Sequence, residues 1–299
     1  MNEVYHIPAL LKETIEGLNI HKEGIYVDVT FGGGGHSRAI LQEGAGHLYS
    51  FDQDRDALKN AIEDERWTFV HSNFRYLRNW MDYYGVEGID GLLADLGVSF
   101  HHFDCPERGF SFRFSAPLDM RMNQTAKRTA ADIVNGYSEE ELAKIFYLYG
   151  ELKNGRQIAK NICKARSQKA IERTEELVAA SRIPAEMSKE LARLFQALRI
   201  EVNDEMGALR EMLVAARDLL KPGGRIAILT YHSLEDRLVK NFLRSGNLEG
   251  TIEKDFYGNN LSPFTLIEKG REASEEEVER NPRARSAKLR VAEKLKIKN

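Results

Sequence analysis

The sequence has little cysteine and no long apolar run, and both absences exclude classes of protein. Its 299 residues include only two cysteines, Cys105 and Cys163. Two are too few for a disulfide framework or a zinc cluster, so we expect no structural metal site. Because no signal peptide or membrane-length apolar stretch is found, we predict a cytoplasmic protein with no membrane contact.

The chain also lacks a strong net charge of either sign. Its formal net charge of −3 argues against indiscriminate binding of polyanions. The average hides two basic stretches, because residues 153–173 carry seven Lys or Arg against one acid, and residues 280–299 carry eight against one. In the first, Arg156, Lys160 and Lys164 recur on one predicted helix face, which we call the basic stripe. Such a stripe is commonly just a solvated face, so it indicates nucleic-acid binding only modestly.

What the chain does contain is enough apolar sequence, 42%, for a sizeable core. Helical spacing is found in residues 7–18 and 54–62, and turn-bounded apolar runs predict five strands, at residues 25–29, 48–52, 67–71, 91–95 and 225–230. Strands that alternate with helices predict an α/β fold with a parallel sheet covered on both faces. Beyond these we predict a helix at 234–243 and strands at 264–267 and 286–291.

A long gap separates the fourth and fifth predicted strands, far more than a normal crossover needs. The gap is helical in pattern, with a capping box of Ser138 and Glu141 and further helices at 157–166, 175–180, 185–202 and 205–220. We therefore predict an all-helical insertion at residues 109–207. Residues 1–108 and 208–299 would then form the two halves of one α/β domain.

The first strand ends in a run of four glycines that leads into a helix. The segment from Asp28 to His36 reads Asp-Val-Thr-Phe-Gly-Gly-Gly-Gly-His. Glycine permits close approach of a ligand, and the start of a helix offers free N–H groups, so this junction is typical of nucleotide-like cofactor sites. The second strand ends in Asp52, an acid placed to accept hydrogen bonds from the hydroxyls of a ribose.

The neighbours of the glycines narrow the choice of cofactor. A nicotinamide or flavin fingerprint would place glycine at position 37, where this chain has Ser37. Asp28, Thr30 and the glycines after it resemble the acid-x-Gly-x-Gly-x-Gly loop of class I S-adenosylmethionine-dependent methyltransferases, with Thr30 in place of the first glycine. Asp28 would either hold the cationic amino-acid end of the cofactor or order the loop.

Functional residues should follow the other strands too, because ligands of open α/β sheets bind at the carboxyl ends of the strands. Phe74 follows the third strand and either covers an adenine ring or simply packs. Asp95 ends the fourth. Amino methyltransferases commonly carry Asp or Asn, two prolines and an aromatic there; this chain has the acid without the prolines or the aromatic, so Phe100 or Phe103 is the candidate for stacking on a base.

Seven segments, which run nearly end to end, form one pattern: residues 28–37, 94–99, 107–112, 117–122, 195–205, 231–237 and 285–290. Together they resemble the RsmH (MraW) family of bacterial 16S rRNA cytosine-N4 methyltransferases. The resemblance implies a Rossmann-like class I methyltransferase domain that uses S-adenosyl-L-methionine. It also implies that the partner is 16S rRNA or the small ribosomal subunit, with a decoding-centre cytidine as acceptor. The sequence leaves the oligomeric state open, a homodimer included.

Family residues can be transferred to matching positions of this chain. The resemblance implies that the cofactor contacts are Gly34, Gly35, His36, Asp52, Phe74, Asp95 and His102. The loop around His102 departs from the family's common form, so either His101 or His102, or neither, touches the cofactor. Arg108, Arg113 and Arg121 contact RNA or the other domain, or pair with Glu107 and Asp119.

The chemistry requires an acceptor that localises the lone pair of the cytosine amine. We predict that Asp95 accepts the amine protons, with Ser99 or His232 assisting. His232 suits a general base near neutral pH, or binds the base, or makes a structural hydrogen bond.

Other reactions and classes remain as alternatives. A carbon-5 cytosine methyltransferase would use Cys105, but its order is Cys-Pro, not Pro-Cys. A DNA amino methyltransferase, a non-catalytic RNA-binding factor and a nicotinamide-dependent dehydrogenase are the further alternatives; Ser37 and Asp28 disfavour the last.

Overall fold

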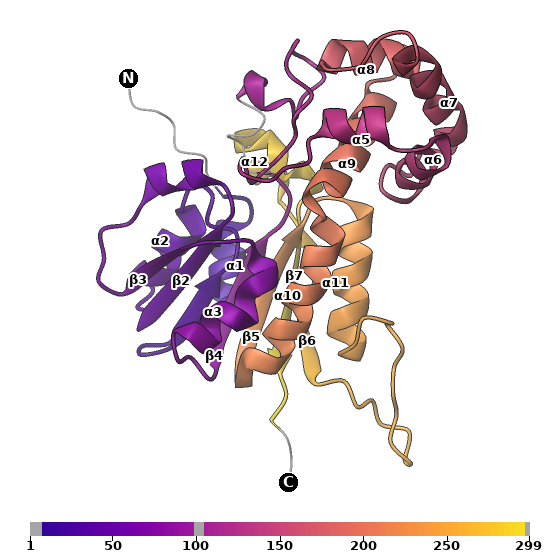
Figure 1. Cartoon of the computed structure of the whole chain (residues 1–299). Coiled ribbons are helices and arrows are strands. Elements are labelled where there is room, and N and C mark those ends of the chain that lie inside the picture. Colours follow the sequence, from indigo (N-terminus) through magenta and orange to yellow (C-terminus); the bar gives the residue numbers. More distant parts are fainter. Residues whose placement is uncertain (1–7, 99–104, 297–299) are drawn as a thin grey trace. The chain divides into compact units, whose positions relative to one another are not determined.

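The computed structural model describes residues 8–98 and 105–296, which form two compact units (Figure 1). The sheet unit comprises the described parts of Met1–Gly97 and Gly207–Asn299, and the helical unit comprises those of Val98–Met206. The division at residue 97 precedes the predicted domain boundary at residue 108, and the division at residue 206 lies next to the predicted one. The chain thus leaves the sheet unit soon after its fourth strand.

The sheet unit is built on one seven-stranded sheet with the order β3-β2-β1-β4-β5-β7-β6. Its strands are β1 (Ile25–Asp28), β2 (His47–Asp52), β3 (Trp67–His71), β4 (Ile89–Asp95), β5 (Leu220–Thr230), β6 (Phe264–Glu272) and β7 (Lys288–Lys294). The five strands predicted first are all present and pair in parallel. The order of the strands reverses between β1 and β4, the arrangement of doubly wound α/β folds.

The sequence predicted no direction for the last two strands, and the structure pairs both of them antiparallel. β7 pairs antiparallel with β5, and β6 pairs antiparallel with β7. β6 forms the edge, and the later strand β7 inserts between it and β5.

Helices of the sheet unit occur between the strands, as expected for this class. They are α1 (Leu11–Leu18), α2 (Gly35–Gln42), α3 (Leu77–Tyr83), α10 (Glu205–Leu219, which begins in the helical unit), α11 (Ser233–Ser245) and α12 (Glu275–Arg280), with short 3-10 turns at Arg55–Asn60, Phe74–Tyr76 and Pro282–Ser286. α1 packs against β4, β5 and β7, as the amphipathic pattern predicted. The helix predicted at residues 54–62 is instead the 3-10 turn Arg55–Asn60, whose Asn60 is bonded to the glycine loop described below.

The core of the sheet unit is apolar and closed to water. Tyr26 and Leu48 from β1 and β2, Leu93 from β4 and Leu289 from β7 are each at most 1% exposed. Their burial fixes the register of each strand, because a shift by one residue would turn these side chains away from the core. No helix within residues 8–98 and 105–296 combines the length and apolar character that a membrane crossing requires.

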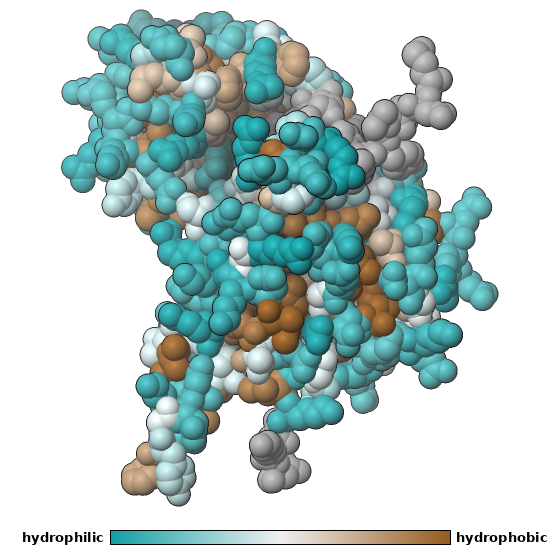
Figure 2. Space-filling view, turned by 180° about the vertical axis from the view of Figure 1, so that it is seen from behind, coloured by the Kyte–Doolittle hydropathy of each residue, from teal (hydrophilic) through white to brown (hydrophobic). Residues whose placement is uncertain are grey.

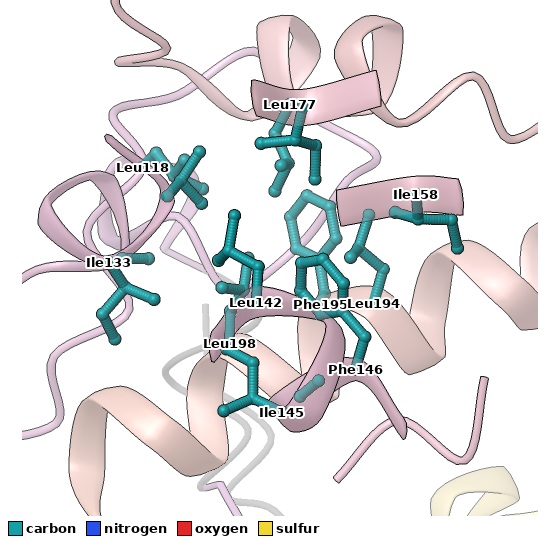
Figure 3. Packing of buried hydrophobic residues seen from close by; sticks show 14 of the residues in the cluster. Leu118, Ile133, Leu142, Ile145, Phe146, Ile158, Leu177, Leu194, Phe195 and Leu198 are labelled. Atoms are coloured by element: carbon teal, nitrogen blue, oxygen red, sulfur yellow. The ribbon is translucent and has the colours of Figure 1, made fainter. Parts of the chain in front are cut away.

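The helical unit has its own core, shown in Figure 3. Its helices are α5 (Ala130–Gly136), α6 (Glu139–Leu148), α7 (Gly155–Arg166), α8 (Thr174–Ser181) and α9 (Ser188–Asn203), besides a 3-10 turn at Pro106–Arg108. Leu142 and Phe146 of α6 point toward Leu198 and Phe195 of α9 (Figure 3). The predicted capping box of Ser138 and Glu141 is confirmed at the start of α6.

Candidate active site

Three aspartates stand at the carboxyl ends of three neighbouring strands. Asp28 ends β1, Asp52 ends β2 and Asp95 ends β4, and β1 lies between the other two. The parallel register brings Asp28 opposite Ser50 on one side and Leu93 on the other. The strand ends therefore gather the predicted acids at one edge, where α/β folds bind their ligands.

The glycine loop is shaped to admit a ligand at the start of α2. Gly34 caps the helix with a φ of 75°, a left-handed conformation that disfavours other residues. A Cβ on Gly33 would meet no atom within 4 Å, so its backbone borders open space. Arg38 donates to the carbonyl of Gly33 at 2.9 Å and to that of Asn60 at 2.7 Å, which holds the loop from behind.

Asp28 orders this loop from inside the protein. Its carboxylate is fully buried and accepts hydrogen bonds from the Thr30 amide at 3.0 Å and the Ser37 hydroxyl at 2.7 Å. The Ser37 oxygen in turn lies 2.8 Å from that of Ser50, which accepts from the Trp67 indole. Burial raises the pKa of Asp28 to about 6, while the bonds from Ser37 and Thr30 lower it. These bonds support the loop-ordering role and explain Ser37 at the position where dinucleotide folds have glycine.

Asp52 links the glycine loop to the turn after β2. Its Oδ2 accepts from the Gly32 amide at 2.9 Å, and its Oδ1 accepts from the Asp54 amide at 2.8 Å. A carboxylate oxygen has two lone pairs, so each retains acceptor capacity after one such bond. The side chain is partly exposed, as an acceptor of ribose hydroxyls has to be.

Asp95 is held by two neighbours. Its amide donates to the Thr30 hydroxyl oxygen at 2.6 Å, and its Oδ1 accepts the hydroxyl of Tyr231 at 2.7 Å. Burial raises the pKa of Asp95 to about 7, the bond from Tyr231 lowers it, and the charges of Asp28 and Glu235 raise it further. Burial also raises the pKa of Tyr231 well above its ordinary value, so the shared proton stays on the phenol. The side chain of Asp95 is 24% exposed, so the carboxyl group is not fully enclosed.

His36 completes the edge beside Asp95. Its Nδ1 lies 3.8 Å from Asp95 Oδ2, and burial lowers its pKa to about 4, so the ring is neutral at physiological pH. Its Nε2 is buried without a hydrogen-bond partner among the described residues. An orphaned nitrogen at the start of a helix, beside open glycine backbone, fits a ligand that supplies the missing bond.

Phe74 lies after β3 in the 3-10 turn Phe74–Tyr76, and its ring is half-buried. Asn73 caps that turn through the amide of Arg75 and also donates to Gln53 at 2.9 Å, which ties the end of β3 to the end of β2. The structure thus brings Phe74 to the same edge of the sheet as Asp52.

His232 sits at the N-cap of α11. Its Nδ1 accepts a long bond from the Glu235 amide at 3.5 Å, and its Nε2 lies 3.0 Å from Glu235 Oε1. The amide of Tyr231 also donates to Glu235, at 3.0 Å. These contacts are those of a capping box, and they favour the structural alternative for His232.

Other predicted residues have different outcomes. Ser99, Phe100, His101, His102 and Phe103 lie outside the described residues. Arg121 pairs with Asp119 at 2.7 Å, and the buried Arg108 donates to the carbonyls of Arg121 and Met122. Arg121 therefore forms the ion pair with Asp119 that the alternative anticipated, and Arg108 bonds to backbone carbonyls of the helical unit.

The basic stripe lies on the exposed face of α7 in the helical unit. All three of its side chains are exposed, and none forms an ion pair with another part of the chain that the structure describes. Lys164 also lines an open cavity of about 570 Å³ between α7 and α8. The opposite face of α7 buries Ile158 and Ile162, as the sequence pattern predicted.

Sequence reasoning missed several residues that support the site. Thr30 bridges the ends of β1 and β4, and Tyr231 holds Asp95 from the end of β5. Arg38 and Asn60 brace the glycine loop. Thr30 and Tyr231 carried a signal, because each lies in one of the seven segments of the resemblance.

Comparison with known proteins places these features in a family. The model of the MraW methylase family matches residues 3–295. The chain is 60% identical to the ribosomal RNA small subunit methyltransferase H of Phocaeicola vulgatus, over 98% of each chain. It is also 60% identical to that of Parabacteroides distasonis, over 97% of this chain and 98% of the relative. An rRNA methylase from Streptococcus thermophilus of known structure aligns with 97% of this chain and 99% of its own, at 15% identity and a TM-score of 0.43. The chain belongs to the MraW methylase family.

Proposed function

We infer that this chain methylates the RNA of the small ribosomal subunit with S-adenosyl-L-methionine as methyl donor, and we propose the exocyclic N4 amine of a decoding-centre cytidine as the acceptor. The first statement rests on the family and on relatives that are 60% identical over nearly their whole length. The second rests on one observation above all, the partly exposed Asp95 carboxylate with one oxygen held by Tyr231.

The carboxyl edge of the sheet fits the cofactor. Gly34 and Gly35 stand at the start of α2, the backbone of Gly33 before them borders open space, and the orphaned Nε2 of His36 follows. Asp52 accepts the ribose hydroxyls in our proposal, and Phe74 covers the adenine. His102 stays a predicted contact. When bound, the cofactor supplies a methyl group activated by a sulfonium charge.

Asp95 positions the cytosine amine that accepts the methyl group. Cytosine's amine is a weak nucleophile because its lone pair is delocalised into the ring. An amine N–H donated to Asp95 Oδ2 fixes the orientation of that lone pair, and Tyr231 prevents the carboxylate from turning away. Orientation of this kind contributes roughly 7–11 kcal/mol in favourable cases. Ser99 and His232 stay predicted assistants of Asp95.

The reaction requires ionised Asp95, since a protonated carboxyl is a weaker hydrogen-bond acceptor than a carboxylate. With a pKa of about 7, ionisation rises as the pH rises through neutrality. Turnover should therefore increase across that range. The proton of the amine leaves as the methyl arrives, and water is a sufficient acceptor for it.

The helical unit and the basic C-terminal stretch bind RNA in this proposal. Three exposed cations on one face of α7 have no ion-pair partner among the described residues, so they are available to neutralise RNA phosphates. The target base has to leave its stack to reach an acceptor at the end of a strand, such as the partly buried Asp95.

The test is mass spectrometry of 16S rRNA from cells that lack the gene, complemented with wild type, Asp95→Ala or Asp82→Ala. We expect N4-methylcytidine with wild type and with Asp82→Ala, an exposed acid on α3. Asp95→Ala should abolish the mark while the purified protein still binds the cofactor. An Asp95→Ala enzyme with full methylation would exclude the acceptor role, and a mark on another atom or on DNA would exclude the proposed acceptor.

A further inference from the structure

A hairpin-like segment leaves the sheet unit on the side opposite the active site. Residues 247–263 connect α11 to β6 (Figure 1). Phe264, the first residue of β6, pairs with Lys294, and the neighbouring Glu293 pairs with Arg225 on β5. Asp95 pairs with Leu229, at the other end of β5. The segment therefore starts and ends at the amino edge of the parallel strands, and nothing at its tip reaches the reacting groups.

The tip of this segment has a defined turn. The Asp255 carboxylate accepts from the amides of Tyr257 at 2.9 Å and Asn259 at 2.8 Å, and from the Asn259 side chain at 2.9 Å. Gly258 provides the left-handed residue, with a φ of 86°. A bridge between Lys254 and Asn260 closes the base of the turn. Local bonds thus hold the two residues that follow Asp255 in a fixed position.

Those two residues are aromatic and face water. Phe256 is 98% exposed and Tyr257 is 87% exposed, the two highest values for large apolar side chains among the described residues. Their rings meet edge to face with centroids 5.7 Å apart. Ile252 and Leu261 on the two arms are exposed as well. In Figure 2 the segment projects from the surface with hydrophobic colour at its end. A preorganised aromatic pair of this kind is typical of binding hot spots.

The charge of the segment selects among partners. It carries three acids, Glu249, Glu253 and Asp255, against the single Lys254. An acidic environment repels RNA phosphates and anionic lipid, whereas it attracts a cationic protein surface. Addition of a strand at β6 is also disfavoured, because β6 has two register irregularities in its pairing with β7.

We propose that this aromatic tip, residues 252–261, docks onto a cationic protein surface of the assembled small subunit. The proposal rests on the small-subunit substrate inferred above. It makes the tip an anchor that selects assembled particles over protein-free rRNA. Because the anchor lies away from Asp95, it changes binding and leaves the chemical step unchanged.

The experiment compares wild type with the double variant Phe256→Ala/Tyr257→Ala on two substrates, purified small subunits and protein-free 16S rRNA. Cosedimentation with small subunits measures binding without methylation, and labelled methyl transfer gives KM and kcat. Tyr83→Ala, another exposed aromatic of the sheet unit, is the matched control. We expect the double variant to bind small subunits about thirtyfold more weakly, the loss typical of a hot-spot aromatic. Its kcat and its KM for free rRNA should match wild type.

A charge variant gives an independent measurement. Glu253→Lys should weaken binding to small subunits and leave the turn intact, because Asp255 makes the side-chain bonds of the turn. Equal loss on both substrates would show that the tip binds RNA and would overturn the proposal. So would unchanged cosedimentation, or a wild-type self-association that the double variant loses. A wild type that binds small subunits through the tip but methylates neither substrate would instead refute the proposed function.

Discussion

Replacement of Tyr231 by Phe tests the arrangement of the active site most directly. The change removes one oxygen and leaves the ring in place, so the buried packing of the side chain is retained. It also deletes the hydrogen bond of 2.7 Å that the phenol donates to Asp95 Oδ1. In the wild type this bond lowers the pKa of Asp95 against the effect of burial. Without it, the carboxyl should hold its proton to higher pH.

The size of the shift follows from the energy of such a bond. A hydrogen bond to a charged group contributes roughly 1.5–3 kcal/mol, which corresponds to about 1–2 pKa units. From a starting value of about 7, the pKa of Asp95 in the variant should rise to about 8.5. At a pH of about 7.5, the ionised fraction then falls from about three quarters to about one tenth, and activity falls about eightfold. At a pH of about 9.5 the two enzymes should differ little.

The assay is labelled methyl transfer to rRNA, with kcat/KM measured across pH because it reports the groups of the free enzyme. Tyr26→Phe is the control, since it removes another buried phenol that accepts from the His21 amide at the far end of β1. That control should leave the acidic limb of the profile in place. A Tyr231→Phe enzyme whose activity is reduced equally at every pH would refute the link between the phenol and the ionisation of Asp95.

Two further expectations concern stability and RNA. Because the folded state raises the pKa of Asp95 from 3.8 to about 7, it binds the proton more tightly than the unfolded chain does, and stability falls as the pH rises between these values. Asp95→Asn should therefore raise the free energy of unfolding at a pH of about 8.5, by at most about 4 kcal/mol, and change it little at a pH of about 4. Thermal unfolding measures this as a higher Tm of the variant at the higher pH; a variant with the Tm of the wild type at both pH values would contradict the unfavourable charge of Asp95. Reversal of the basic stripe to Glu should weaken rRNA binding at least tenfold and reduce its salt dependence without affecting cofactor binding, and unchanged rRNA affinity in a filter-binding assay would make the stripe an ordinary solvated face.

Local patterns were sufficient to predict most elements of the fold. The strands at 25–29 and 91–95 and the helices of the insertion carry strong periodicity, and the structure has them within a few residues. The 3-10 turn Arg55–Asn60 escaped prediction because its conformation depends on Asn60, which donates to Gly32 from a distant part of the chain. The antiparallel direction of β7 could not be predicted from local sequence either, since side chains alternate in the same way in parallel and antiparallel strands.

Site residues were predictable where their position at the end of a strand or the start of a helix indicated their role. Asp52 and Asp95 end strands, and the glycines precede a helix, so a sheet topology was enough to bring them together. Tyr231 is different, because a tyrosine after a strand has many possible partners and only the fold brings it to Asp95. For His232 the residue type suggested chemistry, whereas the contacts are those of a helix cap.

The place of β7 in the sheet has a consequence for synthesis of the chain. β6 is synthesised before β7, yet within the described sheet it pairs with β7 alone. The edge of β5 that faces away from β4 also pairs with β7. As the chain emerges from the ribosome, the open side of β5 stays unpaired until residues 288–294 are available. An unpaired strand edge of this kind is prone to aggregate and is a natural binding site for chaperones. Nascent chains halted before β7 should therefore depend on chaperones, although the residues of the candidate active site have already been made.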